Sequence, residues 1–213
     1  MKIYSLLLAA VLVIVVAAGF TLAGNEALTE KSLSSVGEVA SWSADPVHSK
    51  IGFKVKHLGI SNVRGEFKDY DVSLSFDPAD LSTLEASTSV QIASITTDNQ
   101  RRDNHLRSPD FFSADEFPVM TFVSKEVRNI DGSEFELVGD LTIRDVTKEV
   151  VLEAEFFGTA SMRGSERAAF EARTKINRLD YELKWNRMTE AGGFVVGHDV
   201  TIILELELVE ESS

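Results

Sequence analysis

The chain has 213 residues and a formal net charge of −13, and it contains no cysteine. This length suits one domain of ordinary size plus a leader, with a core that can stand without disulfides. The lack of cysteine excludes a disulfide scaffold, a thiol nucleophile, a thiolate metal site and a lipid-modified N-terminal cysteine. The acidic balance argues against a nucleic-acid partner and against electrostatic docking on anionic lipid, because both need clustered lysine and arginine.

The N-terminal segment 1–23 has the features of a targeting sequence. Lys2 is its only charged side chain, and an apolar run over 6–20 precedes small residues. This pattern predicts a secretory signal peptide, and therefore a periplasmic or secreted protein. An uncleaved anchor is the alternative, because about 20 uncharged residues reach the spanning length, and we expect membrane contact only in that case. The polar segment 24–41 is predicted to be a linker, and the domain is predicted to cover 42–210.

Residues 50–76 predict the first two strands of that domain. In the first strand the residues Ile51, Phe53, Val55 and His57 share one face and lysines occupy the other, which is the period of a half-buried strand. In the second, apolar residues fall on odd positions up to Phe67 and on even positions from Val72. One extra residue exchanges the faces of a strand, so we predict a bulge or sharp bend over 68–71.

Six further segments alternate with the period of a strand, and one insert does not. The strand segments are 84–92, 119–127, 135–143, 150–156, 168–176 and 200–208. The insert at 96–112 is polar and charged. Within it, Thr97 and Gln100 fit a capping box for a short helix over 99–107, and Ser108-Pro109 is a second helix start signal.

The pattern as a whole predicts an all-β domain. It has eight strands with short connections, arranged as an antiparallel meander with a short helical insert between strands 3 and 4. Eight strands can close into a barrel whose interior holds one small ligand, and closure removes exposed strand edges. A two-sheet sandwich is the competing architecture, and periodicity alone does not separate the two.

Short motifs occur along the chain in a fixed order. They are His57-Leu58-Gly59, Gly65 with Phe67, Arg102-Asp103, His105-Leu106-Arg107-Ser108, Asp110-Phe111-Phe112, Pro118 with Thr121-Phe122, and Gly139-Asp140-Leu141-Thr142 with Val146-Thr147. In this combination the chain from Trp42 to Val209 resembles the YceI-like family of polyisoprenoid-binding periplasmic proteins. One position departs from the family pattern: Asp145 stands where glycine is common, which concerns only the turn type.

The resemblance implies a lipocalin-like eight-stranded barrel that holds a long isoprenoid chain in an elongated apolar cavity, often with a quinone-like head. It implies a binding protein rather than an enzyme, with the isoprenoid or quinone as ligand and no other cofactor. It also implies that a homodimer is common. At about 0.8 kcal/mol per buried CH₂, each five-carbon unit gains roughly 4 kcal/mol gross on leaving water, before the costs of ordering.

The predicted cavity wall consists of apolar residues on the inward face of the strands. They are Ile51, Phe53, Val55, Phe67, Phe122, Phe135, Leu137, Phe170, Ile202 and Leu204. The alternative is that these side chains fill a dry core. Periodicity alone favours the filled core, because small barrels are usually packed solid, whereas the resemblance favours a cavity.

His57 is the polar residue of this inward face and belongs to the predicted ligand site. It is either a core histidine satisfied by a carbonyl or the insert, or a contact to a ligand head group at the barrel mouth. His105 is predicted to lie in a helix packed over one barrel end, within a surface charge network. Arg102 and Asp103 are predicted to anchor that helix by pairing with strand ends. Trp185 is predicted to pack onto its own domain or to cover the cavity mouth.

Other chemistry has weaker support in the sequence. The four histidines are scattered without HxH or HExxH spacing, although strand ends can bring distant residues together, and no metal is predicted. GxSxG and the glycine loops of nucleotide sites are absent. Two functions besides lipid carriage stay open: an enzyme acting on an isoprenoid or quinone head group with His57 as acid or base, and a stress-related structural barrel with a solid core.

Overall fold

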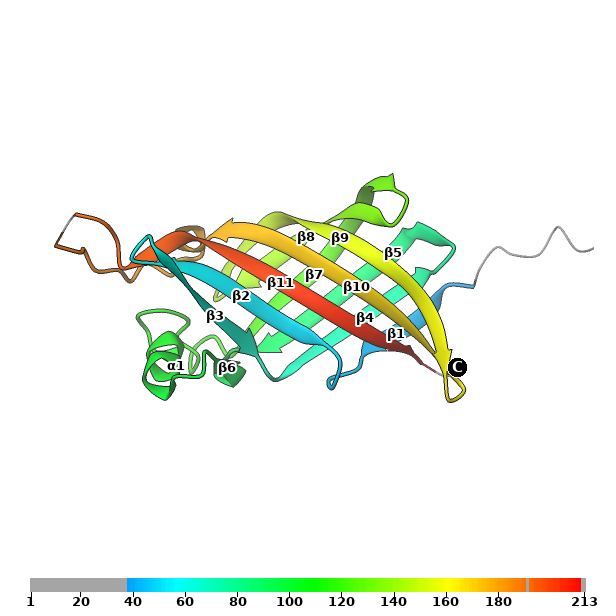
Figure 1. Ribbon diagram of the computed structural model, residues 1–213, viewed down its shortest axis with the longest axis horizontal. Helices are drawn as coiled ribbons and strands as arrows, with labels where there is room; N and C mark the ends of the chain where they lie inside the picture. Colours follow the sequence, from blue (N-terminus) through cyan, green and yellow to red (C-terminus); the bar gives the residue numbers. More distant parts are fainter. Residues whose placement is uncertain (1–37, 191, 212–213) are drawn as a thin grey trace, which may run out of the picture. The chain divides into compact units, whose positions relative to one another are not determined.

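The computed structural model describes residues 38–190 and 192–211, which form one antiparallel β-barrel (Figure 1). The predicted signal peptide and most of the predicted linker lie outside the described residues. Within the described ranges, no helix combines the length and the apolar character that crossing a bilayer requires.

Within residues 38–190 and 192–211, the barrel contains eleven strands, one α-helix and two short 3₁₀ segments. The strands are β1 (Ala40–Ala44), β2 (Lys50–His57), β3 (Ser61–Phe67), β4 (Tyr70–Asp77), β5 (Asp80–Gln91), β6 (Ile95–Thr96), β7 (Val119–Asp131), β8 (Glu134–Ile143), β9 (Val146–Met162), β10 (Ser165–Asn177) and β11 (Val196–Glu210). The helix α1 covers Gln100–Arg107, and the 3₁₀ segments are η1 (Ile92–Ser94) and η2 (Arg178–Tyr181).

The sheet closes on itself through β1. This strand pairs with β4 on one side and with the end of β11 on the other, so β1, β4, β5, β7, β8, β9, β10 and β11 form a ring of eight antiparallel strands. β2 and β3 extend the wall along the first part of β11, and β6 pairs with β3. The predicted all-β antiparallel barrel is confirmed, and closure eliminates the sandwich.

The predicted bend in the second strand is confirmed. β3 ends at Phe67 and β4 begins at Tyr70, with two residues outside either strand. The apolar face is odd-numbered before this break, where Phe67 is buried, and even-numbered after it, where Val72 is buried. The break therefore lets one stretch of chain face the interior in two successive parts of the wall, as the change of parity requires.

The structure differs from the sequence prediction at β1. This strand begins at Ala40, in the segment predicted as linker, and the alternation did not identify it. Five residues with one large apolar side chain give a weak period of two. Trp42 nevertheless is 2% exposed and packs against Phe76 with 5.3 Å between ring centroids, so tertiary packing fixes the strand.

The helical insert is confirmed, but two of its predicted signals are wrong. The N-cap of α1 is Asn99, whose side-chain oxygen accepts a hydrogen bond from the backbone of Arg102 at 3.0 Å. Thr97 does not cap the helix, because its backbone and hydroxyl both donate to Asp103. No second helix begins after Ser108. The chain there forms consecutive turns, in which the backbone N–H of Ser113 donates to the Ser108 carbonyl at 2.9 Å.

Aromatic side chains fill one half of the barrel. Phe156 and Phe170 stack at 4.8 Å, and Phe76 packs edge-on against Phe170 at 5.3 Å. Phe135 and Trp42 complete the cluster. This half lies toward the ends of β1 and β11 and the β9–β10 turn, called here the far end. The opposite end carries α1, the β2–β3 turn and the segment 182–195, and is called here the insert end (Figure 1).

Candidate functional site

An apolar cavity of about 90 Å³ lies inside the barrel at the insert end. No polar atom reaches its surface. The strands supply most of its wall and the insert supplies the rest. The lining residues are Ile51, Gly52, Phe53, Val55, Phe67, Leu106, Phe111, Phe112, Met120, Ile143, Ile176, Arg178, Leu183, Val196, Val200 and Ile202.

A second cavity of about 50 Å³ continues toward the middle of the barrel. Ile51, Met120 and Ile202 belong to the walls of both cavities and therefore form the partition between them. The other lining residues of the second cavity are Thr88, Val90, Thr121, Phe122, Leu141, Val150, Leu152, Thr174 and Leu204. The two cavities together form one apolar path through the barrel, called here the interior path, which only the three partition side chains interrupt. Met120 is the most adaptable of these, because its unbranched thioether has several rotatable bonds.

The helix α1 is fixed over this path by three charged residues. The buried carboxylate of Asp103 accepts a hydrogen bond from the backbone of Thr97 at 2.8 Å, and Arg102 donates to the Thr97 carbonyl at 2.8 Å. Arg107 donates to the carbonyls of Ala93 and Ile95 at 2.8 and 2.7 Å. The predicted anchoring of the helix by Arg102 and Asp103 is thus confirmed. Leu106, on the same helix, faces the cavity.

An aromatic cluster joins α1 to the segment 182–195. His105 packs edge-on against Trp185 at 4.8 Å and against Phe111 at 5.1 Å, and its ring nitrogen bonds Asp110 at 2.8 Å. Because Phe111 lines the cavity, these rings cover its insert end. His105 therefore has the packing role that the sequence favoured, and Trp185 contributes to the cover.

Two glycines make room for aromatic rings of the cavity wall. A Cβ atom on Gly65 would lie 2.6 Å from Cε1 of Phe53, and one on Gly139 would lie 2.6 Å from Cε2 of Phe122. Each ring therefore occupies the space that a side chain on the neighbouring strand would need. A side chain at either glycine would push the ring into the path, so these glycines help to keep the interior partly unfilled.

Arg178 is a buried cation at the edge of the larger cavity. It is 2% exposed, and its guanidinium donates to the backbone carbonyls of Gly197 at 2.9 Å and of Leu183. Burial lowers the pKa of Arg178. Since no polar atom reaches the cavity surface, its aliphatic stem forms the wall and its charge is directed to the backbone of β11 and the 182–195 segment. Arg178 thus holds the cover in place rather than presenting a charge to a ligand.

The structure brings together most of the residues predicted for the cavity wall. Ile51, Phe53, Val55, Phe67 and Ile202 line the larger cavity, and Phe122 and Leu204 line the smaller one. Phe135, Leu137 and Phe170 lie outside both walls, buried in the hydrophobic core. His57 lies at the last position of β2, beyond the cavity wall and opposite Ser61 and Val196. Phe135, Leu137 and Phe170 thus pack in the filled core, seven predicted residues border a cavity, and His57 does neither.

Sequence reasoning missed the contribution of the insert to the wall. Phe111 and Phe112 line the cavity but lie in turns of a polar segment, where periodicity carries no information. An aromatic pair among charged residues could have indicated that this segment packs against the barrel. Ile143, Ile176 and Val200 have the same inward parity as predicted neighbours on their strands. Which inward residues border a void depends on ring packing between strands, and alternation does not encode that.

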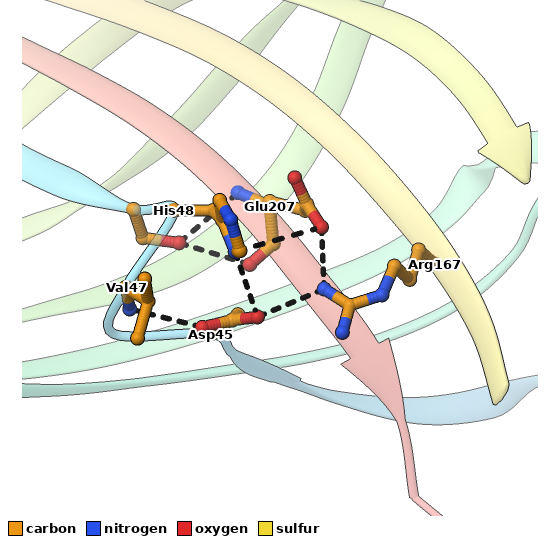
Figure 2. A network of polar contacts seen from close by, with 6 residues as sticks. Asp45, Val47, His48, Arg167 and Glu207 are labelled. Carbon is orange, nitrogen blue, oxygen red and sulfur yellow. Dashed lines mark hydrogen bonds and ion pairs between the residues drawn. The ribbon is translucent and has the colours of Figure 1, made fainter. Parts of the chain in front are cut away.

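A polar network at the far end joins the β1–β2 connection to β10 and β11 (Figure 2). Arg167 donates to Asp45 at 2.8 Å and to Glu207, and His48 bonds Asp45 at 3.0 Å. These contacts hold the pKa of Asp45 far below its usual range, with Arg167 the largest cause. Among the described residues, Asp45, His48 and Glu207 are the group whose ligand atoms approach within 4.8 Å, as a metal site requires. The guanidinium of Arg167 already occupies the cation position between the carboxylates.

A hollow of about 450 Å³, larger than either interior cavity, lies on the outer surface of the barrel. It is lined by β8, β9 and β10 with charged residues such as Glu136, Glu153 and Arg173. Its carboxylates are paired in part with arginines, as Arg173 with Glu153 at 2.9 Å. Such a solvated, charged surface fits an apolar ligand far less well than the interior path.

Comparisons with known proteins agree with this architecture. The YceI-like domain family matches residues 42–208. A UPF0312 protein of Staphylococcus aureus is 42% identical over 158 residues, covering 73% of this chain and 90% of its own length. The solved YceI protein of Campylobacter jejuni is 35% identical with a TM-score of 0.65, covering 89% of this chain and all of its own. A polyisoprenoid binding domain from Saccharophagus degradans, at 16% identity, TM-score 0.56 and coverage of 82% and 100%, shares the fold. The chain belongs to the YceI-like family.

Proposed function

We propose that the protein binds one isoprenoid-type lipid chain inside the barrel, as a carrier or store and without catalysis. The observation that carries this proposal is the apolar path at the insert end, whose larger cavity exposes no polar atom. Dry apolar cavities gain most from apolar ligands, because water finds no hydrogen-bond partners there. The described polyisoprenoid binding of the Saccharophagus degradans domain, which shares the fold, supports the same ligand class.

The proposed ligand enters with its hydrocarbon tail directed toward the far end. The far half of the barrel is filled by aromatic rings, so the tail ends where the second cavity ends. The two cavities have room for only a short chain, and a longer one requires Met120 and its neighbours to rotate. A quinone-type or polyprenyl head group stays at the insert end, because the cavity offers it no polar partner. His57 is the proposed polar contact there.

The proposed site of action is outside the cytoplasm, in the periplasm or as a secreted protein. The targeting features of segment 1–23 and membership of the family support this location. A carrier in an aqueous compartment needs a soluble exterior, which the net charge of −13 favours. The homodimer stays a prediction that light scattering of the purified protein would measure.

Organic extraction of the purified protein, followed by mass identification of what it released, tests the proposal. We expect an unmodified isoprenoid lipid at close to one molecule per chain. Ile202→Trp places a larger side chain in the partition between the cavities and is expected to lower the recovered lipid at least tenfold. Ile203→Trp, the adjacent position on the opposite strand face, is the matched control and is expected to retain it. A protein that is reproducibly empty, or equal losses in both variants, would contradict the proposal.

A further inference from the structure

Two neighbouring hairpin tips at the insert end expose large apolar side chains. Leu58 and Ile60 form the β2–β3 turn, and Met188 and Phe194 face each other across the segment before β11. Ile60 is 85% exposed, Met188 67% and Phe194 48%. The backbone of Leu58 donates to the carbonyl of Val195 at 2.9 Å, so the two tips lie side by side (Figure 1). We call Leu58, Ile60, Met188 and Phe194 the tip patch.

Backbone hydrogen bonds hold these side chains outward. In the first tip, Leu58 and Gly59 both have positive φ, at 53° and 74°, and Ile60 donates a backbone hydrogen bond to the His57 carbonyl at 3.2 Å, which closes a tight turn. In the second, Thr189 donates to the Gly193 carbonyl at 2.7 Å and Val195 to the Arg187 carbonyl at 2.9 Å. The tips therefore project from the barrel as short hairpins, and their apolar residues do not fold back onto the core. A group of exposed apolar residues beside a ligand cavity indicates an interaction surface.

Basic residues stand directly behind the tip patch. The sequence from 51 to 65 contains Lys54, Lys56 and Arg64 and no acidic residue. The second hairpin carries Arg187 and one acidic residue, Glu190, so basic side chains outnumber acidic ones by four to one in the two tips. Within the described part of the chain, none of these four takes part in an ion pair. This local charge is opposite to the net charge of −13. Strands rise about 3.3 Å per residue, so Lys56 lies roughly 7 Å behind Leu58, the depth of lipid headgroups above an inserted side chain.

We propose that the tip patch docks the insert end onto a lipid bilayer that carries anionic headgroups. The apolar tips enter the boundary between headgroups and acyl chains, and the basic residues behind them contact the headgroups. A second copy of the chain fits this surface poorly, because a symmetric contact would bring two basic rims together. The inference deepens the proposed function and rests on it for its purpose, since docking places the insert end, where the larger cavity lies, at the membrane. It departs from the expectation, drawn from the net acidic charge, that the protein does not dock electrostatically on anionic lipid.

The far end of the barrel supplies matched controls. Phe157 is 59% exposed on β9 and Met162 is exposed at the end of the same strand. The acidic residues Glu155 and Glu166 lie near them in the β9–β10 pair. Arg163 stands in the β9–β10 turn, so apolar exposure there is combined with charges of both signs and no excess of basic residues, and this end is expected to stay away from an anionic bilayer.

The absence of cysteine allows single-site labelling of the full chain. Ile60→Cys, Phe194→Cys and Phe157→Cys are each labelled with the environment-sensitive fluorophore NBD and mixed with vesicles. The vesicles contain either phosphatidylcholine alone or phosphatidylcholine with 30% phosphatidylglycerol. We expect emission at 60 and 194 to rise severalfold with the anionic vesicles and to stay unchanged at 157. This signal reports local insertion of the tips, so a retained leader that inserts by itself does not produce it.

The fluorescence results distinguish an anionic bilayer from a neutral bilayer and from a second copy of the chain. No change at 60 and 194, or an equal change at 157, overturns the proposal. A concentration-dependent rise without vesicles identifies self-association instead, and an equal rise with phosphatidylcholine alone overturns the anionic requirement. Lys56→Glu with Arg64→Glu is expected to weaken binding to anionic vesicles about thirtyfold, whereas the far-end Arg163→Glu leaves it unchanged. Lipid extraction of the same samples tests the cavity separately, so docking and lipid binding can fail independently.

Discussion

Met120 separates the two interior cavities, and its truncation tests whether ligand carbons pass between them. The side chain is buried and belongs to both cavity walls. In the empty protein, Met120→Ala removes its contacts and joins voids of about 90 and 50 Å³. Core Met→Ala changes lower the unfolding free energy by about 2–5 kcal/mol, and we expect about 3 kcal/mol here because voids already flank the side chain.

In protein loaded with an isoprenoid chain, the same change is expected to lower the unfolding free energy by only about 1 kcal/mol. The ligand carbons then occupy the space that Met120 vacates and restore the lost contacts. The difference of about 2 kcal/mol corresponds to roughly thirtyfold tighter ligand binding by the variant. Farnesol, a short isoprenoid alcohol, is a suitable probe for saturating the cavity.

Urea unfolding measures these free energies in a four-way comparison of wild type and Met120→Ala, each delipidated and each with farnesol. Leu208→Ala is the control, because Leu208 is fully buried in the core and lies outside both cavity walls. The decrease in unfolding free energy caused by Leu208→Ala is expected to be the same with and without farnesol. If the loss for Met120→Ala is also the same in both states, within about 0.5 kcal/mol, ligand carbons do not reach the partition and the proposed path is wrong.

Three further predictions concern the framework of the barrel. Asp103→Ala removes the buried acceptor of Thr97 and is expected to cost about 2–3 kcal/mol, with faster hydrogen exchange over the helical insert than elsewhere. Asp45, whose folded pKa is lowered chiefly by Arg167, stabilises the fold fully above the ordinary carboxyl pKa of about 3.9 and loses that contribution as the pH falls below it. In acid unfolding, Asp45→Asn is therefore expected to show a shallower loss of stability below pH 4 than the wild type, and an unchanged slope would refute this linkage. Gly139→Ala is expected to lower the melting temperature measurably, because the added Cβ meets a backbone carbonyl of β7 as well as an aromatic ring.

Much of the barrel could be predicted because most strands signal their inward face locally. Ile51 and Phe53 alternate with lysines, and the change of parity after Phe67 located the break between β3 and β4. Successive side chains of a strand point to opposite faces of the sheet, so a half-buried strand can be recognised in the sequence by its period of two. β1 was missed because its five residues give too short a pattern, and its place is set by pairing with both β4 and β11.

The candidate site was predicted only in part. Alternation predicts the same inward orientation for Phe122 and Phe170, so it cannot tell which of them borders a cavity. The structure separates them: Phe122 lies against Gly139 and borders a cavity, whereas Phe170 stacks on Phe156 and fills the far half. Whether an inward side chain borders a void depends on three-dimensional packing between strands that are distant in sequence.

The sequence by itself determined the all-β class, the order and faces of most strands, the helical insert and the family resemblance. These follow from local period, turn chemistry and short motifs, which need no knowledge of distant contacts. The tertiary structure decided where the barrel closes, which half of it is solid, and how the insert covers the cavity. It also decided that the turn at Leu58 and the hairpin at Phe194 meet, because only long-range pairing between β2 and β11 brings them together.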